Sequence, residues 1–431
     1  MRNLFSVSKS RTSEVRLCVR CSGNVSAEDR FCVSCGHEVS AVPSTRYHGL
    51  DALRGIAMLI GIVLHSALPY IPNIEAFWPA DKGSSQAMNT VFQFIHIWRM
   101  PLFFILSGFF AHLIINRGSW KNWWGNRFLR IGIPIVVFFP LMSLTIPWIF
   151  QYGKTGQLIF FYSDEGQPFH MWFLWQLMIF VVLTALFRFP YLMVVAILNG
   201  LNKIGISFTG NIFRKCKYGL SGILLRSRFP LAFIILGSLI NLPTQGELIA
   251  NPIASGLYFV IGYSIYKNAS LFEFLKDHWR YYLIVGVLGF ILLMILDSKD
   301  LVTDIYSIDL DGDEYLKAIT EPFAAIKVFI EITCAMMFSY AFIGLSENKF
   351  GSYDPKLRFV SDGAYWMYLI HLPIVTFLTF LMFGWTVSVW YKFSLAIVAT
   401  SAICFLTYRY MVRPTIIGIL LNGKRHPWKF P

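Results

Sequence analysis

The sequence contains few charged residues, and this deficit excludes most classes of soluble protein. Asp, Glu, Lys and Arg make up 14% of the 431 residues, whereas soluble domains average about 25%. Hydrophobic residues make up 56%, which excludes intrinsic disorder because disordered segments are poor in hydrophobic residues. Seven cysteines are too few for a disulfide scaffold of this length, and 31 glycines are too few for a collagen. A polytopic membrane protein remains.

Acidic residues are the scarcer of the two charge types. The chain has 24 Asp and Glu against 37 Lys and Arg, which gives a formal net charge of +13. In a soluble protein this excess would indicate nucleic-acid binding. In a membrane protein it instead indicates a charge bias between loops, so we expect no nucleic-acid partner.

Ten apolar stretches approach the roughly 20 residues that a helix needs to cross a lipid bilayer. The sequence therefore predicts an all-α polytopic membrane protein with about ten transmembrane helices. A further apolar stretch, 189–198, is too short to span and is either an interfacial helix or the end of the fourth span. The expected spans are 50–71, 90–115, 130–151, 170–187, 229–243, 251–266, 281–297, 320–345, 363–384 and 390–408.

The cations are distributed unevenly once the loops are assigned alternately to the two sides of the membrane. The side that holds the N-terminal segment collects 29 of the 37 Lys and Arg residues, and the opposite side only four. Cytoplasmic loops carry such an excess, so we expect a multi-pass protein of the cell inner membrane with both termini in the cytoplasm. The first 49 residues contain no apolar run, and the first span is expected to act as an uncleaved signal anchor.

Four cysteines near the N-terminus have the spacing of a metal site. The segment CVRCSGNVSAEDRFCVSC reads C-x2-C, ten residues, and C-x2-C again. Two such knuckles can place four thiolates around one tetrahedral Zn²⁺, and four protein ligands make the ion structural. Two disulfides or free thiols are the alternative, which a cytoplasmic location disfavours. The expected zinc ligands are Cys18, Cys21, Cys32 and Cys35.

This metal module defines the expected domain organisation. A module of about 20 residues cannot bury a core of its own, so the metal would supply its folding energy. We expect an N-terminal tail at 1–17, a cytoplasmic zinc ribbon at 18–38, a linker at 39–47, a membrane domain at 48–424 and a cytoplasmic tail at 425–431.

Two polar residues of the first span share one helix face. Arg54 and His65 are eleven residues apart, which corresponds to about three turns and a rise of about 16 Å. Charged and imidazole groups are costly at membrane depth, so both are candidates for function. Arg54 could also extend to the inner interface beside Asp51, and His65 could form an inert hydrogen bond to a neighbouring helix.

Further histidines and one arginine lie in other spans. On the expected topology His96, Arg99 and His170 fall in the outer half of the membrane together with His65, and His371 lies within the ninth span. Their convergence predicts a polar site in that half. We expect Gly108 to serve close helix packing, and Lys327 to pair with the glutamate four residues later.

Several ordered motifs together support a family resemblance. They are Asp51-x-x-Arg54 with the Arg54-x10-His65 spacing, FIHIWRMPLFFILSGFF at 94–110, WKNWWGNRFLRIGIPI at 120–135, HMWFLW at 170–175, YLIHLPI at 368–374 and LLNGK at 420–424. Over residues 47–424 the chain resembles the membrane-bound acyltransferase 3 family, in particular a branch implicated in succinylating periplasmic glucans. The zinc ribbon is a departure from the familiar members of that branch.

The resemblance implies an activity and roles for individual residues. Members of the family have ten spans and transfer acyl groups from cytoplasmic coenzyme A donors to hydroxyls of glycans or other acceptors outside the membrane. Arg54 and His65 match the family's essential arginine and histidine, and Arg127 and Arg130 match its basic loop after the second span. We therefore expect an integral-membrane O-acyltransferase that moves a succinyl or acetyl group from acyl-coenzyme A to an extracytoplasmic glycan.

In this scheme the candidate residues divide between donor binding and chemistry. Arginines suit the phosphates of coenzyme A, so the three arginines above are expected to hold the donor. His65 would act as a general base or carry the acyl group, and His96, Arg99 or His170 would stabilise the oxyanion. The catalytic candidates are His65, His96, Arg99, His170 and His371.

Two other functions remain open from the residues alone. The same buried charges could line the path of a secondary transporter. Alternatively, the zinc ribbon could recruit a cytoplasmic protein partner and the membrane part could act as a sensor. No internal repeat is visible in the sequence, which counts against the transporter.

Overall fold

The computed structural model divides the chain into two units, Met1–Tyr47 and His48–Pro431. It describes residues 16–17, 24–25, 46–117, 119–160, 169–203, 224–225, 227–244, 247–249, 251–299 and 322–422. In the first unit the described residues form two short antiparallel strands, β1 (Arg16–Leu17) and β2 (Asn24–Val25). The four cysteines of the expected zinc ribbon lie outside the described residues.

The second unit is a bundle of helices. The principal helices are α1 (His48–Ala67), α2 (Gln86–Arg117), α3 (Trp120–Arg127), α4 (Ile133–Thr155), α5 (Trp172–Lys203), α7 (Leu231–Asn241), α8 (Pro252–Lys267), α9 (Ala269–Lys299), α11 (Pro322–Phe350), α12 (Pro355–Leu381), α13 (Val389–Thr407) and α14 (Ile416–Asn422). Short turns of 3₁₀ helix are η1 (Leu68–Tyr70), η3 (Phe169–Met171) and η4 (Leu242–Thr244), and π-helical turns are η2 (Phe128–Gly132) and η5 (Tyr408–Val412). The all-helical membrane domain expected from the hydropathy pattern is confirmed.

Eight helical segments within the described residues are long and apolar enough to cross a membrane. They correspond to eight of the ten expected spans. The other two, 229–243 and 251–266, form α7 and α8, which have 11 and 16 residues. A helix of 16 residues is about 24 Å long, shorter than a bilayer core of about 30 Å. The stretch 189–198 continues α5, so it is the end of the fourth helix.

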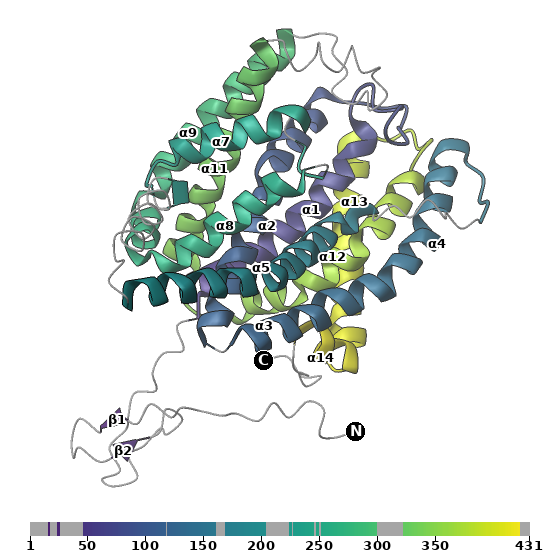
Figure 1. Ribbon diagram of the computed structural model, residues 1–431. Coiled ribbons are helices and arrows are strands. Elements are labelled where there is room, and N and C mark those ends of the chain that lie inside the picture. Colours follow the sequence, from purple (N-terminus) through teal and green to yellow (C-terminus); the bar gives the residue numbers. More distant parts are fainter. Residues whose placement is uncertain are drawn as a thin grey trace. The chain divides into compact units, whose positions relative to one another are not determined.

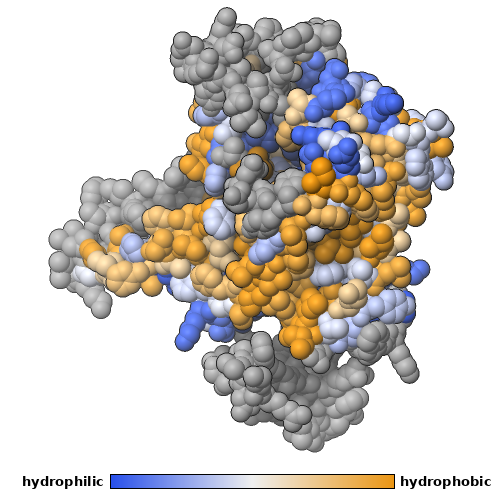
Figure 2. All heavy atoms as spheres, turned by 90° about the vertical axis from the view of Figure 1, so that its right-hand side faces the viewer, coloured by the Kyte–Doolittle hydropathy of each residue, from blue (hydrophilic) through white to orange (hydrophobic). Residues whose placement is uncertain are grey.

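The helices differ strongly in how much they are buried. In the apolar window of α11, 72% of the residues are buried inside the protein, whereas in that of α5 only 11% are. Large apolar side chains are exposed on the outer helices, including Val136 of α4 and Phe189 of α5. Figure 2 shows a broad hydrophobic surface on one face, with hydrophilic residues gathered above it. This distribution is the one expected of a surface that contacts lipid.

Two glycines bring α2 and α8 into direct backbone contact. A Cβ atom on Gly108 of α2 would collide with the carbonyl oxygen of Phe259, and one on Gly262 of α8 would collide with that of Ile105. The small residue at each position lets the two backbones touch, as is typical of membrane helices. The expected packing role of Gly108 is thus confirmed.

We call the two ends of the helical bundle proximal and distal, according to where α1 begins and ends. The proximal end is where α1 and α12 begin and α2 ends, and the distal end is where α1 ends and α2 begins. In Figure 1 the distal end is at the top and the proximal end, with α3 and α14, is at the bottom. α9 and α11 form one side of the bundle and α4 the other, with α1 and α2 between them.

Candidate active site

Three histidines and one arginine form a cluster towards the distal end, here called the distal cluster. His65 comes from the last turn of α1, His371 from α12 and His170 from η3. The ring centroids of His65 and His371 are 5.3 Å apart, and those of His170 and His371 are 5.5 Å apart. The structure therefore joins three rings that are separated by up to 306 residues in the chain.

Hydrogen bonds to backbone carbonyls fix the proton positions on two of these rings. Nδ1 of His371 lies 3.0 Å from the carbonyl oxygen of Met367 and 2.9 Å from that of Tyr368, so Nδ1 carries the donated proton. Nε2 of His170 likewise donates to the Tyr368 carbonyl at 3.1 Å. The opposite nitrogens, Nε2 of His371 and Nδ1 of His170, are buried and have no hydrogen-bond partner among the described residues. In the neutral rings both are proton acceptors.

Nδ1 of His65 is also buried without a hydrogen-bond partner in the described part of the chain. Such atoms cost about 1–3 kcal/mol each when nothing pairs with them. Three of them within one cluster indicate a site that is built to meet another molecule rather than to hold the fold together.

Arg99 of α2 supplies the positive charge of the distal cluster. Its side chain is buried, and its Nε has no hydrogen-bond partner among the described residues. The guanidinium packs against α1 at Gly61, where an added Cβ would lie 2.5 Å from Nη2. It interacts electrostatically with His65, His170 and His371. A buried arginine beside proton acceptors is suited to stabilise a developing negative charge.

The connection between α1 and α2 covers this cluster. Trp78 stacks near His65 with a centroid distance of 6.3 Å and meets Phe150 of α4 edge to face. Asp81 anchors the connection through a buried ion pair in which Nζ of Lys392 lies 2.8 Å from Oδ2. The sequence alone singled out neither Trp78 nor Asp81. Lys392 was visible as a cation inside an apolar stretch, but nothing in the sequence indicated its partner.

His96 faces away from the distal cluster. Its Nε2 lies 3.5 Å from Oε1 of Glu247, in the connection that follows α7 and η4. Burial raises the pKa of the Glu247 carboxyl, but the charge and hydrogen bond of His96 more than offset that effect and hold the pKa below its usual value. His96 still interacts electrostatically with His65. Of the five catalytic candidates, the structure therefore joins four directly and places the fifth on the adjacent face of α2.

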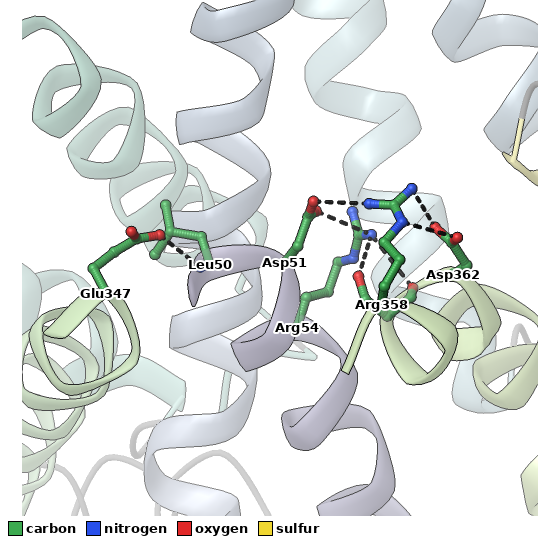
Figure 3. A network of polar contacts seen from close by, with 7 residues as sticks. Leu50, Asp51, Arg54, Glu347, Arg358 and Asp362 are labelled. Carbon is green, nitrogen blue, oxygen red and sulfur yellow. Dashed lines mark hydrogen bonds and ion pairs between the residues drawn. The ribbon is translucent and has the colours of Figure 1, made fainter. Parts of the chain in front are cut away.

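An ionic network lies at the proximal end, where Arg54 points toward α12 (Figure 3). Nη2 of Arg54 donates to Oγ of Ser361 at 3.1 Å and lies 3.5 Å from Oδ1 of Asp51. Arg358 bridges Asp51 at 3.1 Å and Asp362 at 2.9 Å. The expected proximity of Arg54 to Asp51 is present, so its charge is partly balanced within the protein.

Arg127 and Arg130 complete a group of three cations, here called the proximal arginines. Both interact electrostatically with Arg54. Neither has a carboxylate within ion-pair distance in the part of the chain that the structure describes, and Nε of Arg127 is buried without a partner there. The hydroxyl of Tyr365 bonds to the backbone carbonyl of Arg130, which positions the loop. These three cations, two of them without a carboxylate partner among the described residues, make this end of the bundle a candidate site for an anion.

One expected pair is wrong. Lys327 of α11 does not pair with Glu331, four residues further on, because its Nζ lies 2.8 Å from Oδ1 of Asp297 on α9. The carboxylate of the neighbouring helix offers the better geometry. Within the described residues, no group of three or more His, Cys, Asp or Glu side chains could hold a metal ion.

Comparison with known families places the chain in a class of enzymes. The model of the acyltransferase 3 family, described as an acyltransferase domain, matches residues 47–409. The chain belongs to this family of membrane-type acyltransferases.

Individual relatives are similar over a shorter region. Glucans biosynthesis protein C of Salmonella typhi and that of Salmonella typhimurium are each 36% identical to the chain over 116 residues. The match covers 27% of this chain and 29% of each relative, so it spans less than a third of the curated relatives' length. No solved structure matches the chain.

Proposed function

We propose that the protein transfers an acyl group from acyl-coenzyme A, bound at the proximal end, to a hydroxyl of a glycan on the opposite side of the membrane. One observation carries the proposal: α1 holds Arg54 among the proximal arginines and His65 in the distal cluster. Eleven residues separate them, which is about 16 Å along the helix. An anion site and a proton-accepting site are thus joined by one rigid element.

The proximal arginines suit the phosphates of the donor. A guanidinium offers a planar pair of donors that matches phosphate oxygens. Arg127 and Arg130 are available for this role because no carboxylate among the described residues pairs with them. The pantetheine arm of coenzyme A is long and thin. It would extend between the helices and present the thioester near His65.

The distal cluster then carries the acyl transfer. His65 takes the proton of the acceptor hydroxyl while the hydroxyl oxygen attacks the thioester carbonyl carbon. Arg99 stabilises the oxyanion that forms. The carbon–sulfur bond breaks, and the coenzyme A thiolate leaves with the proton from His65, so that the products are an O-acyl ester and free coenzyme A. In the covalent variant the neutral His65 ring attacks the thioester carbon first, and coenzyme A leaves as the thiolate. The acceptor hydroxyl then displaces the acyl group from His65, and its proton goes to the thiolate, so that the products are the same.

The name of the relatives, Glucans biosynthesis protein C, supports a glucan as the acceptor. Succinyl and acetyl are the groups we propose. We also propose that the protein resides in the inner membrane with both termini in the cytoplasm, because 29 of its 37 cations fall on that side of the expected topology. A reporter fused after Pro431 that is active only outside the cytoplasm would contradict this orientation.

The N-terminal segment is proposed to bind one structural Zn²⁺ through Cys18, Cys21, Cys32 and Cys35, on the spacing of its two C-x2-C pairs. Elemental analysis of the reduced full-length protein should give one zinc per chain. Cys32→Ser should lose it, whereas Cys404→Ser in α13 should retain it. A zinc-free wild-type protein would refute the site.

The proposed activity is tested with the full-length protein in lipid vesicles. Acyl-coenzyme A carrying a labelled acyl group and a linear glucan are added, and the label is followed from thioester to glucan. Label on the glucan, in amounts matching the free coenzyme A released, supports the transferase. Exchange of solute across the vesicle membrane with no loss of thioester would instead indicate the transporter.

A further inference from the structure

A second polar site lies at the distal end, on the opposite side of α2 from the distal cluster. A partly open cavity of about 90 Å³ is lined by residues of α2, α5, α8, α9, α11 and the connection before α8. Its polar wall includes Gln93, His96, Glu247, Tyr258 and Glu331. A cavity of this volume has room for polar atoms of another molecule as well as for water.

Two of these polar groups make no hydrogen bond within the part of the chain that the structure describes. The Tyr258 side chain is 1% exposed, and its hydroxyl has no hydrogen-bond partner among the described residues. Glu331 makes no hydrogen bond or ion pair with the described residues either, because the nearby Lys327 pairs with Asp297. An unpaired carboxylate within an apolar helix is expensive and marks a functional position. The Tyr258 hydroxyl and the Glu331 carboxylate, which line the same cavity, are therefore both available to bind a ligand.

The chemistry of the wall favours a ligand that is rich in hydroxyl groups. Glu331 accepts hydrogen bonds, while the Tyr258 hydroxyl and the Gln93 amide both accept and donate them. Trp172 and Met100 add apolar surface to the same cavity. Sugars combine hydroxyls with apolar C–H faces, and binding sites pair a few polar groups with aromatic walls in this way. A metal ion is disfavoured because no three potential ligand side chains converge in the described residues.

The cavity and the distal cluster share two supporting segments. On α2, Arg99 belongs to the cluster while His96 and Met100 line the cavity. Two residues after His170 of the cluster, Trp172 lines the cavity. A chain of sugars could thus place one unit in the cavity and present a hydroxyl of another unit to His65.

We propose that this cavity is a subsite for the carbohydrate acceptor, in which Glu331 and Tyr258 bind sugar hydroxyls. The inference rests on the proposed function for the identity of the acceptor. It goes further in assigning the acceptor to named residues outside the distal cluster and outside the motifs of the family resemblance.

Acceptor binding is measured directly, by calorimetry on the full-length protein in detergent with linear glucose oligomers from a dimer to a hexamer. Glu331→Gln and Tyr258→Phe should each weaken binding by roughly tenfold, the value of one hydrogen bond to a charged or buried group. Tyr340→Phe is the matched control, since that hydroxyl is also buried and unpartnered within the described residues but does not line the cavity. Glu273→Gln, which alters an exposed pair with Lys276, controls for the loss of a carboxylate.

The outcomes separate this inference from the proposed function because no acyl donor is present. Weakened binding in both cavity variants, with monodisperse protein and both controls at the wild-type value, supports the subsite. Wild-type affinity in both variants overturns it, as does a wild-type protein that binds no glucose oligomer. A protein that binds oligomers through the cavity yet never transfers an acyl group would refute the proposed function alone.

Discussion

Arg54 of the proximal arginines and His65 of the distal cluster lie on the same helix, but the polar groups around them are in different environments. At the proximal end, Arg54 is 39% exposed and sits in a network of carboxylates and hydroxyls. At the distal end, His371 is 1% exposed, and its Nε2 has no partner in the described part of the chain. Arg54 thus shares its charge with several polar groups, whereas His371 keeps one ring nitrogen buried and unpaired among the described residues.

This difference separates binding from chemistry. A site that must release a phosphorylated product benefits from exposed, shared charges, because such contacts are individually weak. A site that moves protons benefits from burial, since electrostatic effects grow as water is excluded. A substitution at the distal end should therefore reduce stability or activity more than a matched substitution at the proximal end.

The largest contrast is expected between two lysines. Lys392→Met leaves Asp81 charged and buried, so unfolding should become easier by about 3–5 kcal/mol. Lys276→Met at the proximal end breaks only an exposed pair with Glu273 and should cost at most about 1 kcal/mol. Thermal unfolding in detergent checks both values. Replacing Asp81 by Leu in the Lys392→Met background should recover most of the lost stability. Equal losses of stability in Lys392→Met and Lys276→Met would contradict the prediction.

The catalytic assignment predicts that His65→Ala cuts turnover by roughly 100-fold or more while coenzyme A affinity stays close to the wild-type value. His65→Gln should be as inactive, because the amide forms hydrogen bonds but takes no proton. Folded yield, donor affinity and transfer rate are measured on the same samples. Well-folded His65→Ala protein with wild-type turnover would end the assignment, and His371 would be tested next.

The donor assignment predicts a smaller effect in affinity. Arg127→Ala and Arg54→Ala should each weaken coenzyme A binding by roughly tenfold, and Arg54→Lys should recover only part because a point charge replaces a planar fork. Lys276→Met provides the control at the same end. Unchanged coenzyme A affinity in both alanine variants would place the donor elsewhere.

The smallest expected effect concerns the pair of His96 and Glu247. The folded pKa of Glu247 lies below its usual value of 4.5, so the carboxylate stabilises the fold above that pH and this contribution is lost as the pH falls through the folded pKa. Glu247→Gln should therefore lower stability at neutral pH by at most about 1 kcal/mol, since both side chains are partly exposed. Melting curves recorded at pH 7 should show this difference between Glu247→Gln and wild type, and the difference should shrink as the pH falls through the folded pKa of Glu247.

Sequence reasoning succeeded where a feature depends on one segment alone. Apolar length identifies eight of the long helices without knowledge of their neighbours, because each spanning helix satisfies its own backbone. The shared face of Arg54 and His65 follows from helix geometry in the same way.

It failed where a feature depends on which helices are neighbours. The partner of Lys327 is on α9 rather than on its own helix, and Lys392 reaches an aspartate 311 residues away. α2 is apolar on nearly every side, so its sequence gives no indication that His96 and Arg99 face different neighbours. The proximity of His371 to His65 likewise requires that α1 and α12 pack side by side.

The backbone contact between α2 and α8 has a mechanical consequence. Where Gly108 meets Phe259 and Gly262 meets Ile105, no side chains intervene that could change rotamer to absorb a displacement. We therefore expect α2 and α8 to move together as one rigid unit. The cavity that both helices line should then keep its width. An alanine at either glycine would push the two backbones apart and disturb this rigid unit.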